Sequence, residues 1–169
     1  MKDITKQLKE IKESIPENCT LVAVSKTKPN EDILEAYNAG HRDFGENKVQ
    51  EMVQKSEELP TDIKWHMIGH VQRNKVKYMA SFVHLIHGVD TFKLLKEINK
   101  RAKNEERTID CLLQVHIAKE DTKFGFDESE VTELLEGDEL KELENIRVTG
   151  LMGMATNTEK EDQVRSEFQ

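Results

Sequence analysis

Cysteine is scarce in this sequence: 169 residues hold only Cys19 and Cys111. The two lie far apart and belong to no CxxC or Cys/His pattern of the kind that binds zinc. We therefore expect two free thiols rather than a disulfide or a zinc site, as is usual in reducing compartments.

Long apolar runs and an excess of basic residues are also missing. No apolar segment reaches the length of a signal-peptide core or a membrane span, and residues 1–8 have the spacing of an amphipathic helix. Acidic residues outnumber basic ones by 33 to 25, for a net charge of −8, which opposes non-specific binding to nucleic acid or to an anionic membrane. With 36% apolar residues the chain can form one core, so we expect a single cytoplasmic domain.

Strand-like and helix-like segments alternate along the whole chain. Pro16 ends a leading helix, Gly40 is placed to end a second one, and Asp127 with Glu130 forms a capping box before a late one. We expect strands at residues 20–25, 42–45, 63–68, 82–87, 109–117 and 146–152, and helices at 4–15, 30–40, 48–59, 72–80, 91–103 and from 127 onward.

This alternation predicts a parallel sheet, and both a doubly wound sheet and a (β/α)₈ barrel satisfy it. Eight units of this size would need roughly 220 residues, within the range of a compact barrel. The chain stops at Gln169, inside the helix expected after the sixth strand. We therefore expect about six βα units of a barrel that is incomplete at its C-terminus, with two unpaired strand edges.

A lysine follows the first strand. The run Leu21-Val-Ala-Val24 is apolar at every position, which predicts a strand buried on both faces, and Ser25 and Lys26 come directly after it. Ligands of parallel α/β folds bind at the C-terminal ends of the strands. An amine at this place is a candidate for Schiff-base chemistry as well as for simple charge.

Five segments at or just beyond the ends of expected strands carry a resemblance to a known family. They are Val24-Ser-Lys-Thr-Lys-Pro29, Phe44-Gly-Glu-Asn47, Trp65-His-Met-Ile-Gly-His-Val-Gln-Arg-Asn-Lys75, Glu120-Asp-Thr-Lys-Phe-Gly125 and Gly150-Leu-Met-Gly-Met-Ala155. In this order they closely resemble the pyridoxal phosphate homeostasis protein family, relatives of the alanine racemase N-terminal barrel. The resemblance implies a (β/α)₈ TIM-type barrel that binds pyridoxal 5'-phosphate (PLP) without established turnover.

The resemblance implies that Lys26 forms the Schiff base with the aldehyde of PLP. A nucleophilic amine must lose its proton, so the ordinary lysine pKa of about 10.4 has to be lowered by burial or by a neighbouring positive charge. Lys28 is placed to supply that charge. The alternative for a lysine at a strand end is a solvated side chain.

Two neighbours of Lys26 are expected in the Gly-Glu-Asn motif. Asn47 is predicted to lie near the cofactor, with a helix N-cap as its alternative. Glu46 is interpreted either as a buried acid facing the barrel centre or as a carboxylate in the first turn of a helix.

Three further positions complete the predicted cofactor site. His66 is expected at the barrel mouth, either beside the cofactor or as a packed histidine with a backbone partner, and its spacing from His70 suits a metal only on a helix. Lys123 matches an arginine that contacts the cofactor in the related racemases, with its charge kept and its bidentate geometry lost. Met154 stands where those racemases place a histidine against the pyridine ring, and a thioether cannot transfer protons.

The sequence thus predicts a PLP carrier or buffer in intracellular PLP homeostasis, with apo forms of PLP-dependent enzymes as partners and no nucleic acid or membrane. The resemblance implies that the segments after the seventh and eighth strands hold the phosphate, so the chain without them should bind PLP weakly. A PLP-dependent amino-acid racemase that uses Lys26 as its base is one alternative. The other is a partial barrel that associates through its open edges, where the complete protein is a monomer.

Overall fold

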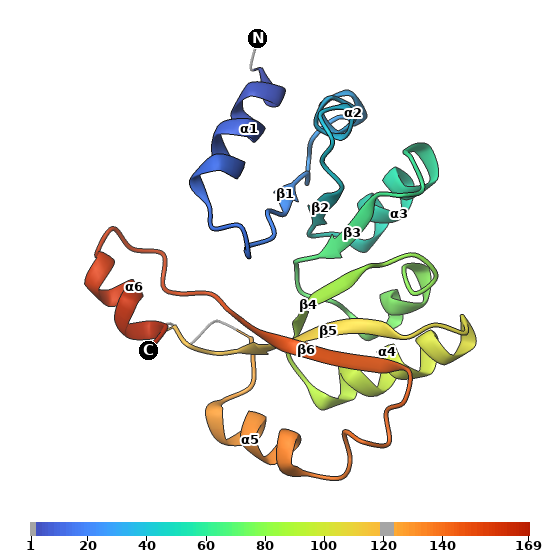
Figure 1. Ribbon diagram of the computed structural model, residues 1–169. Coiled ribbons are helices and arrows are strands. Elements are labelled where there is room, and N and C mark those ends of the chain that lie inside the picture. Colours follow the sequence, from blue (N-terminus) through green and yellow to red (C-terminus); the bar gives the residue numbers. More distant parts are fainter. Residues whose placement is uncertain (1–2, 119–123) are drawn as a thin grey trace.

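A parallel sheet with helices between its strands makes up most of the molecule (Figure 1). The computed structural model describes residues 3–118 and 124–169. In chain order the elements are α1 (Ile4–Ser14), β1 (Ala23–Val24), α2 (Asn30–Asn38), β2 (Asp43–Glu46), α3 (Val49–Glu58), β3 (Lys64–Met67), the 3₁₀-helix η1 (Arg73–Tyr78), β4 (Leu85–Val89), α4 (Phe92–Asn104), β5 (Ile109–Val115), α5 (Glu128–Glu136), β6 (Ile146–Gly153) and α6 (Glu161–Glu167). The predicted alternation of strands and helices is confirmed.

The strand order separates the two topologies that the sequence leaves open. Every strand pairs in parallel with the next one along the chain, in the order β1-β2-β3-β4-β5-β6. A doubly wound sheet reverses its direction of growth at a switch point, so its strand order does not follow the sequence. A (β/α)₈ barrel adds each strand beside the previous one. The observed order is therefore that of a barrel, and β1 and β6 are the two edges of the described sheet.

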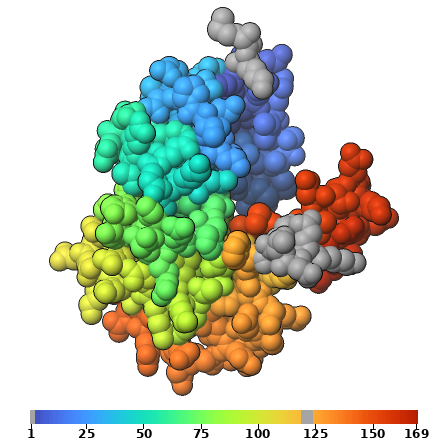
Figure 2. Space-filling view, turned by 180° about the vertical axis from the view of Figure 1, so that it is seen from behind, coloured from blue at the N-terminus to red at the C-terminus, as the bar shows by residue number. Residues whose placement is uncertain are grey.

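The core lies between the sheet and the helices on its outer side. Met67, Ile86 and Cys111 are Cα partners on neighbouring strands, and all three are fully buried. Leu95 and Ile98 of α4 are equally buried and belong to the same cluster. Helices α2, α3 and α4 follow the curve of the sheet on this side (Figure 1), and from behind they form one continuous surface, with α6 protruding at its side (Figure 2).

Two helix boundaries confirm the local signals of the sequence. Gly40 follows the end of α2 with a φ of +86°, a left-handed conformation that glycine adopts without strain. Asp127 accepts a hydrogen bond from the Glu130 amide while the Glu130 side chain accepts one from the Asp127 amide, so the capping box before α5 is complete.

The predicted helix at 72–80 and strand at 82–87 differ from the structure. The helix is a 3₁₀-helix, η1, and its spacing of three places Val76 and Met79 together on the buried side. The amides of Phe82 and Val83 both donate to the Met79 carbonyl, so these residues belong to a turn and the strand begins only at Leu85.

The first strand is shorter and more exposed than its apolar sequence predicts. Only Ala23 and Val24 form β1, and Val24 is 51% exposed, so the expected burial on both faces is wrong. β1 pairs with β2 alone among the described strands, which leaves its other edge open.

Polar side chains line the inner face of the sheet, opposite the helices. The Cα partners in one row across the strands are Val24, Gly45, His66, Leu85, Asp110 and Arg147. On this face His66 Nε2 lies 3.1 Å from Asp43 Oδ1, and His66 Nδ1 lies 2.9 Å from His87 Nε2. One neutral tautomer satisfies both contacts: His66 donates to Asp43 and accepts from His87.

Burial keeps these two imidazoles neutral. Burial, together with the smaller effect of the nearby His66 ring, lowers the pKa of His87 to about 4. Burial also lowers the pKa of His66, while the Asp43 carboxylate acts in the opposite direction. The inner face therefore holds a chain of uncharged histidines at neutral pH.

Two smaller expectations concern thiols and membranes. Cys19 is exposed and Cys111 is buried, and both are free, as the sequence predicts. Burial raises the pKa of Cys111 to about 12. Among the residues that the structure describes, no helix has both the length and the apolar character needed to cross a membrane.

We predict that Ile98→Ala destabilises the fold by about 2–5 kcal/mol, because the truncation leaves a cavity between α4 and the sheet. Urea unfolding measures this change. Ile11→Ala on α1 is the matched control, since Ile11 is 47% exposed and should shift the free energy of unfolding by no more than about 0.5 kcal/mol. Equal effects of the two substitutions would contradict this assignment of the core.

Stability should rise with pH between about 4 and 6.5. An unfolded histidine takes up a proton below its ordinary pKa of 6.5, whereas folded His87 does so only below about 4. The unfolded state binds more protons in this window, so the contribution of His87 is complete above pH 6.5 and is lost as the pH falls toward 4. Urea midpoints across this range should depend less on pH in His87→Gln than in the wild type. An unchanged slope in His87→Gln would refute the prediction.

Candidate functional site

Lys26 stands at the C-terminal end of β1, two residues beyond the strand. Its side chain is exposed and forms no hydrogen bond or ion pair with any residue in the described ranges. In a parallel sheet the C-terminal ends of all strands lie on the same side. The residues that follow β2 and β3 therefore lie on the same side as Lys26. The structure thus leaves an accessible amine at the place where such folds bind ligands.

Asn47 follows β2 at the same edge and is half-buried. A Cβ on Gly69, which follows β3, would lie 2.5 Å from the Asn47 carbonyl oxygen, and a Cβ on Gly88 in β4 would lie 2.9 Å from the Gly69 carbonyl oxygen. Only glycine permits this close approach of the chain segments. The alternative role of Asn47 as a helix N-cap is wrong, because α3 begins at Val49 with Lys48 in the N-cap position.

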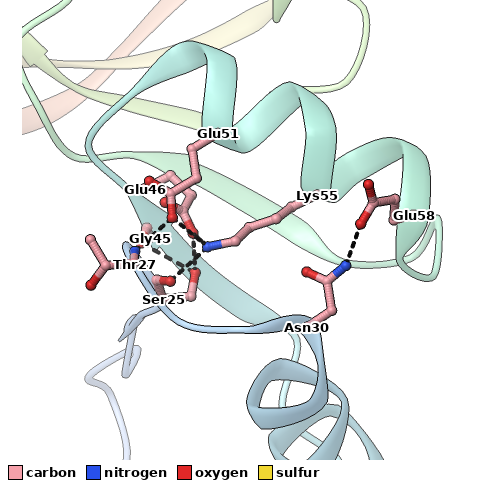
Figure 3. Close-up of polar contacts among 8 residues, drawn as sticks. All are labelled: Ser25, Thr27, Asn30, Gly45, Glu46, Glu51, Lys55 and Glu58. Carbon is pink, nitrogen blue, oxygen red and sulfur yellow. Dashed lines mark hydrogen bonds and ion pairs between the residues drawn. The ribbon is translucent and has the colours of Figure 1, made fainter.

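The turn that carries Lys26 is tied to the neighbouring elements by hydrogen bonds (Figure 3). The Ser25 amide donates to the Gly45 carbonyl at 3.0 Å, and the Ser25 hydroxyl donates to Glu46 Oε1 at 2.6 Å. On the other side of Lys26, the Thr27 amide donates to Glu51 Oε1 at 2.6 Å. The backbone is therefore held immediately before and immediately after Lys26.

Lys55 of α3 lies at the centre of these contacts. Its side chain is 8% exposed, and Nζ donates to the Ser25 carbonyl at 2.7 Å and to Glu46 Oε1 and Glu51 Oε1 at 2.8 Å each. The hydrogen bond from Lys55 is the largest cause of a lowered pKa at Glu51, and the Thr27 amide acts in the same direction. Glu46 is fully buried, and its Oε2 has no partner among the described residues.

Glu46 is buried, as its first interpretation predicts, but it does not face the barrel centre. It is the last residue of β2, and its Cα partner is Met67, in the row that faces the helices rather than the barrel centre. Its carboxylate precedes α3 by three residues and is held by Lys55 and Ser25, not by the first turn of that helix. Strand alternation explains this, because Gly45 faces inward and the next residue must face outward.

Sequence reasoning missed Ser25, Glu51 and Lys55. The signal for Lys55 is present in α3, whose buried residues are Val49, Met52 and Lys55 at a spacing of three. A lysine on the apolar side of a helix needs buried acceptors. Glu51 lies four residues before Lys55, the spacing of an ion pair on one helix face.

His66 is buried and contacts the side chains of Asp43 and His87, so the backbone partner of its second interpretation is wrong. His70 has different neighbours: its Nδ1 lies 2.9 Å from Asp90 Oδ2 and its ring stacks on Phe124. The two histidines therefore do not form one site.

Asp43, His66 and His84 are the group whose geometry comes nearest to a metal site in the described part of the chain. Each offers one ligand atom, and these atoms lie within 4.8 Å of one another. The hydrogen bonds of His66 to Asp43 and His87 already account for the orientation of its ring.

The last two predicted site residues are less closely placed. Met154 directly follows β6, which is the edge strand at the other side of the described sheet from β1, and it is 47% exposed. Lys123 lies outside the described residues. The structure therefore brings Lys26 and Asn47 to neighbouring strand ends and leaves Met154 apart from them.

Comparisons with known proteins show the family and the fold. The family model for the alanine racemase N-terminal domain matches residues 1–169. The pyridoxal phosphate homeostasis protein of Aquifex aeolicus is 43% identical over 90% of this chain and 67% of its own length. The chain thus spans about two thirds of this curated relative.

Solved structures show the same relationship. PipY of Synechococcus elongatus PCC7942 with PLP bound is 33% identical, with a TM-score of 0.87 over 98% of this chain and 76% of that one. The alanine racemase of Clostridium difficile 630 shares the fold at 16% identity, with a TM-score of 0.81 over 99% of this chain and 44% of that one. This chain belongs to the alanine racemase N-terminal domain family and, within it, to the pyridoxal phosphate homeostasis proteins.

Proposed function

We propose that this chain binds PLP through a Schiff base on Lys26 and acts as a carrier or buffer in intracellular PLP homeostasis. The observation that carries the proposal is the exposed, unpaired Lys26 amine on a braced turn at the C-terminal end of β1. The names of the relatives support it, as does the PLP bound to PipY. Asn47, His66, Lys123 and Met154 are the further residues proposed to lie near the cofactor.

The described residues fit the aldehyde end of PLP. When bound, PLP supplies an aldehyde that forms a Schiff base with a primary amine. Lys26 offers that amine without breaking any contact seen in the described structure, and Asn47 at the next strand end offers an amide for orientation. Lys28 is also exposed and adds positive charge two residues away.

A carrier suits the site better than a racemase. Racemisation needs two acid/base groups on opposite sides of the reacting carbon, and Lys26 supplies only one. Met154 stands where the racemases resembled by this sequence place a histidine, and its thioether holds no exchangeable proton. The relatives are named as homeostasis proteins, which agrees with a binding role.

We further propose that the protein works in the cytoplasm as a single PLP-binding barrel domain and meets apo forms of PLP-dependent enzymes there. The free thiols suit a reducing compartment.

Association through the edge strands is a second candidate property. Val24 and Leu151 on the two edge strands favour it, because they are 51% and 58% exposed.

Borohydride reduction after incubation with PLP should attach the label to Lys26, because its amine is exposed at the strand end and unpaired within the described residues. Peptide mapping by mass spectrometry locates the label. Lys26→Ala should lose it, and Lys100→Ala on α4 is the control that should keep it. Label spread evenly over surface lysines, or unchanged in Lys26→Ala, would refute the proposed site.

Incubation with L-alanine and saturating PLP should leave the optical rotation constant, because Met154, where the racemases resembled by this sequence place a histidine, cannot transfer a proton. Polarimetry measures this directly, with a known alanine racemase as the positive control. Reproducible loss of rotation that disappears in Lys26→Ala would overturn the carrier role in favour of the racemase.

A further inference from the structure

The turn from Ser25 to Lys28 has a backbone that its sequence does not favour. The Lys28 amide donates to the Ser25 carbonyl at 3.0 Å, which closes a four-residue turn. Its third residue, Thr27, has a φ of +62°, in the left-handed region where turns usually carry glycine or asparagine. A β-branched residue is disfavoured there, so contacts from outside the turn must hold this conformation.

Those contacts come from two elements that pack against the turn (Figure 3). Glu51 of α3 accepts the Thr27 amide, and Lys55 of α3 donates to the Ser25 carbonyl. Glu46 of β2 accepts the Ser25 hydroxyl. Beyond the turn, Asn30 Nδ2 donates to Glu58 Oε2 at 2.6 Å and fixes the start of α2 to the end of α3.

The buried ion pairs of Lys55 fix the geometry of the turn rather than add to the stability of the fold. All three protons of Lys55 are used, on the Ser25 carbonyl and on two carboxylates. Glu46 occupies a helix-facing position in line with Met67 and Ile86, where an apolar side chain would fill the core without burying a charge. Glu46, Glu51 and Lys55 together contact the turn at Ser25 and at Thr27.

The turn also decides where two neighbouring amines point. Lys26 and Lys28 are both exposed, and either could react with an aldehyde. Lys28 lines an open groove of about 720 Å³ between α1, β1 and α2, whereas Lys26 is not among the residues that line it. A different turn conformation would change which of the two amines stands at the strand ends.

We propose that Glu46, Glu51 and Lys55 are positioning residues that hold the turn so that Lys26, and not Lys28, meets the aldehyde of PLP. Glu51 and Lys55 act through the backbone of Thr27 and Ser25, and Glu46 acts through the Ser25 hydroxyl and Lys55. They do not contact the Lys26 amine. The inference rests on the proposed function and goes beyond it by assigning the choice of lysine to a buried ion-pair group.

Glu51→Ala is the sharpest test, because Glu51 is partly exposed and its loss leaves Lys55 paired with Glu46. Wild-type and variant chains are incubated with PLP, reduced with borohydride and mapped for label on Lys26 and Lys28. Glu51→Ala removes the hydrogen bonds from the Thr27 amide and from Lys55. The ratio of Lys26 label to Lys28 label should fall roughly tenfold, the factor expected for losing the one charge-assisted hydrogen bond that Glu51 makes to the turn. Glu57→Ala is the matched control on the exposed side of α3 and should keep the wild-type ratio.

Two more variants separate positioning from folding. Glu51→Gln keeps an oxygen acceptor for the Thr27 amide and should restore most of the ratio. Lys55→Met should lower the ratio at least as far as Glu51→Ala does, and thermal unfolding followed by circular dichroism shows whether it folds. If Lys55→Met does not fold, Glu51→Ala and Glu51→Gln alone decide whether the positioning role holds.

The possible outcomes distinguish this inference from the proposed function. A wild-type chain with no label on Lys26 refutes both. Label on Lys26 in the wild type, with an unchanged ratio in Glu51→Ala, refutes the positioning role and leaves the proposed function standing. Label that falls equally on both lysines indicates a loss of folded protein and also refutes the positioning role.

Discussion

One ammonium group buried between β2 and α3 organises the end of the sheet where the site lies. Lys55 is removed from water, and such a group is tolerated only where acceptors surround it. Its three acceptors belong to β2, to α3 itself and to the turn after β1. The position of the Lys26 turn is thereby coupled to the packing of a helix, which is more rigid than a loop alone.

The order of the strands brings the Lys26 turn close to the residues that follow β2 and β3. Because every strand pairs with the next one in parallel, the residues after β1, β2 and β3 all lie at the C-terminal ends of the strands, on one side of the sheet. Close contacts from Asn47 to Gly69 and from Gly69 to Gly88 bring these segments together without side chains between them. Lys26 therefore lies beside closely packed backbone segments at the strand ends rather than on a free loop.

The sequence predicts most of the fold because its signals are local. Gly40, Pro16 and the Asp127–Glu130 capping box bound their helices by short-range chemistry, and alternation of apolar segments identifies the strands. The choice between a doubly wound sheet and a barrel depends on which strands pair, and no local pattern encodes that. β1 was predicted as buried for the same reason: its apolar residues are evident, whereas its place at an edge of the described sheet is not.

The site divides in a similar way. Lys26 and Asn47 are evident because they follow strands within quoted motifs, and the structure places both at one edge. The outward direction of Glu46 depends on the pleat of β2, and its partner Lys55 lies nine residues further on, on another element. Contacts of this kind become visible only when a strand and a helix are placed together.

Electrostatics explains why this local geometry matters for an anionic ligand. The net charge of −8 repels PLP at long range, so affinity must come from short-range groups at the site. In the proposed function, the exposed Lys26 amine captures the aldehyde reversibly, and the exposed Lys28 adds positive charge two residues away. On this proposal one exposed amine holds and releases PLP, and Met154, where the racemases resembled by this sequence place a histidine, offers a thioether that cannot transfer a proton.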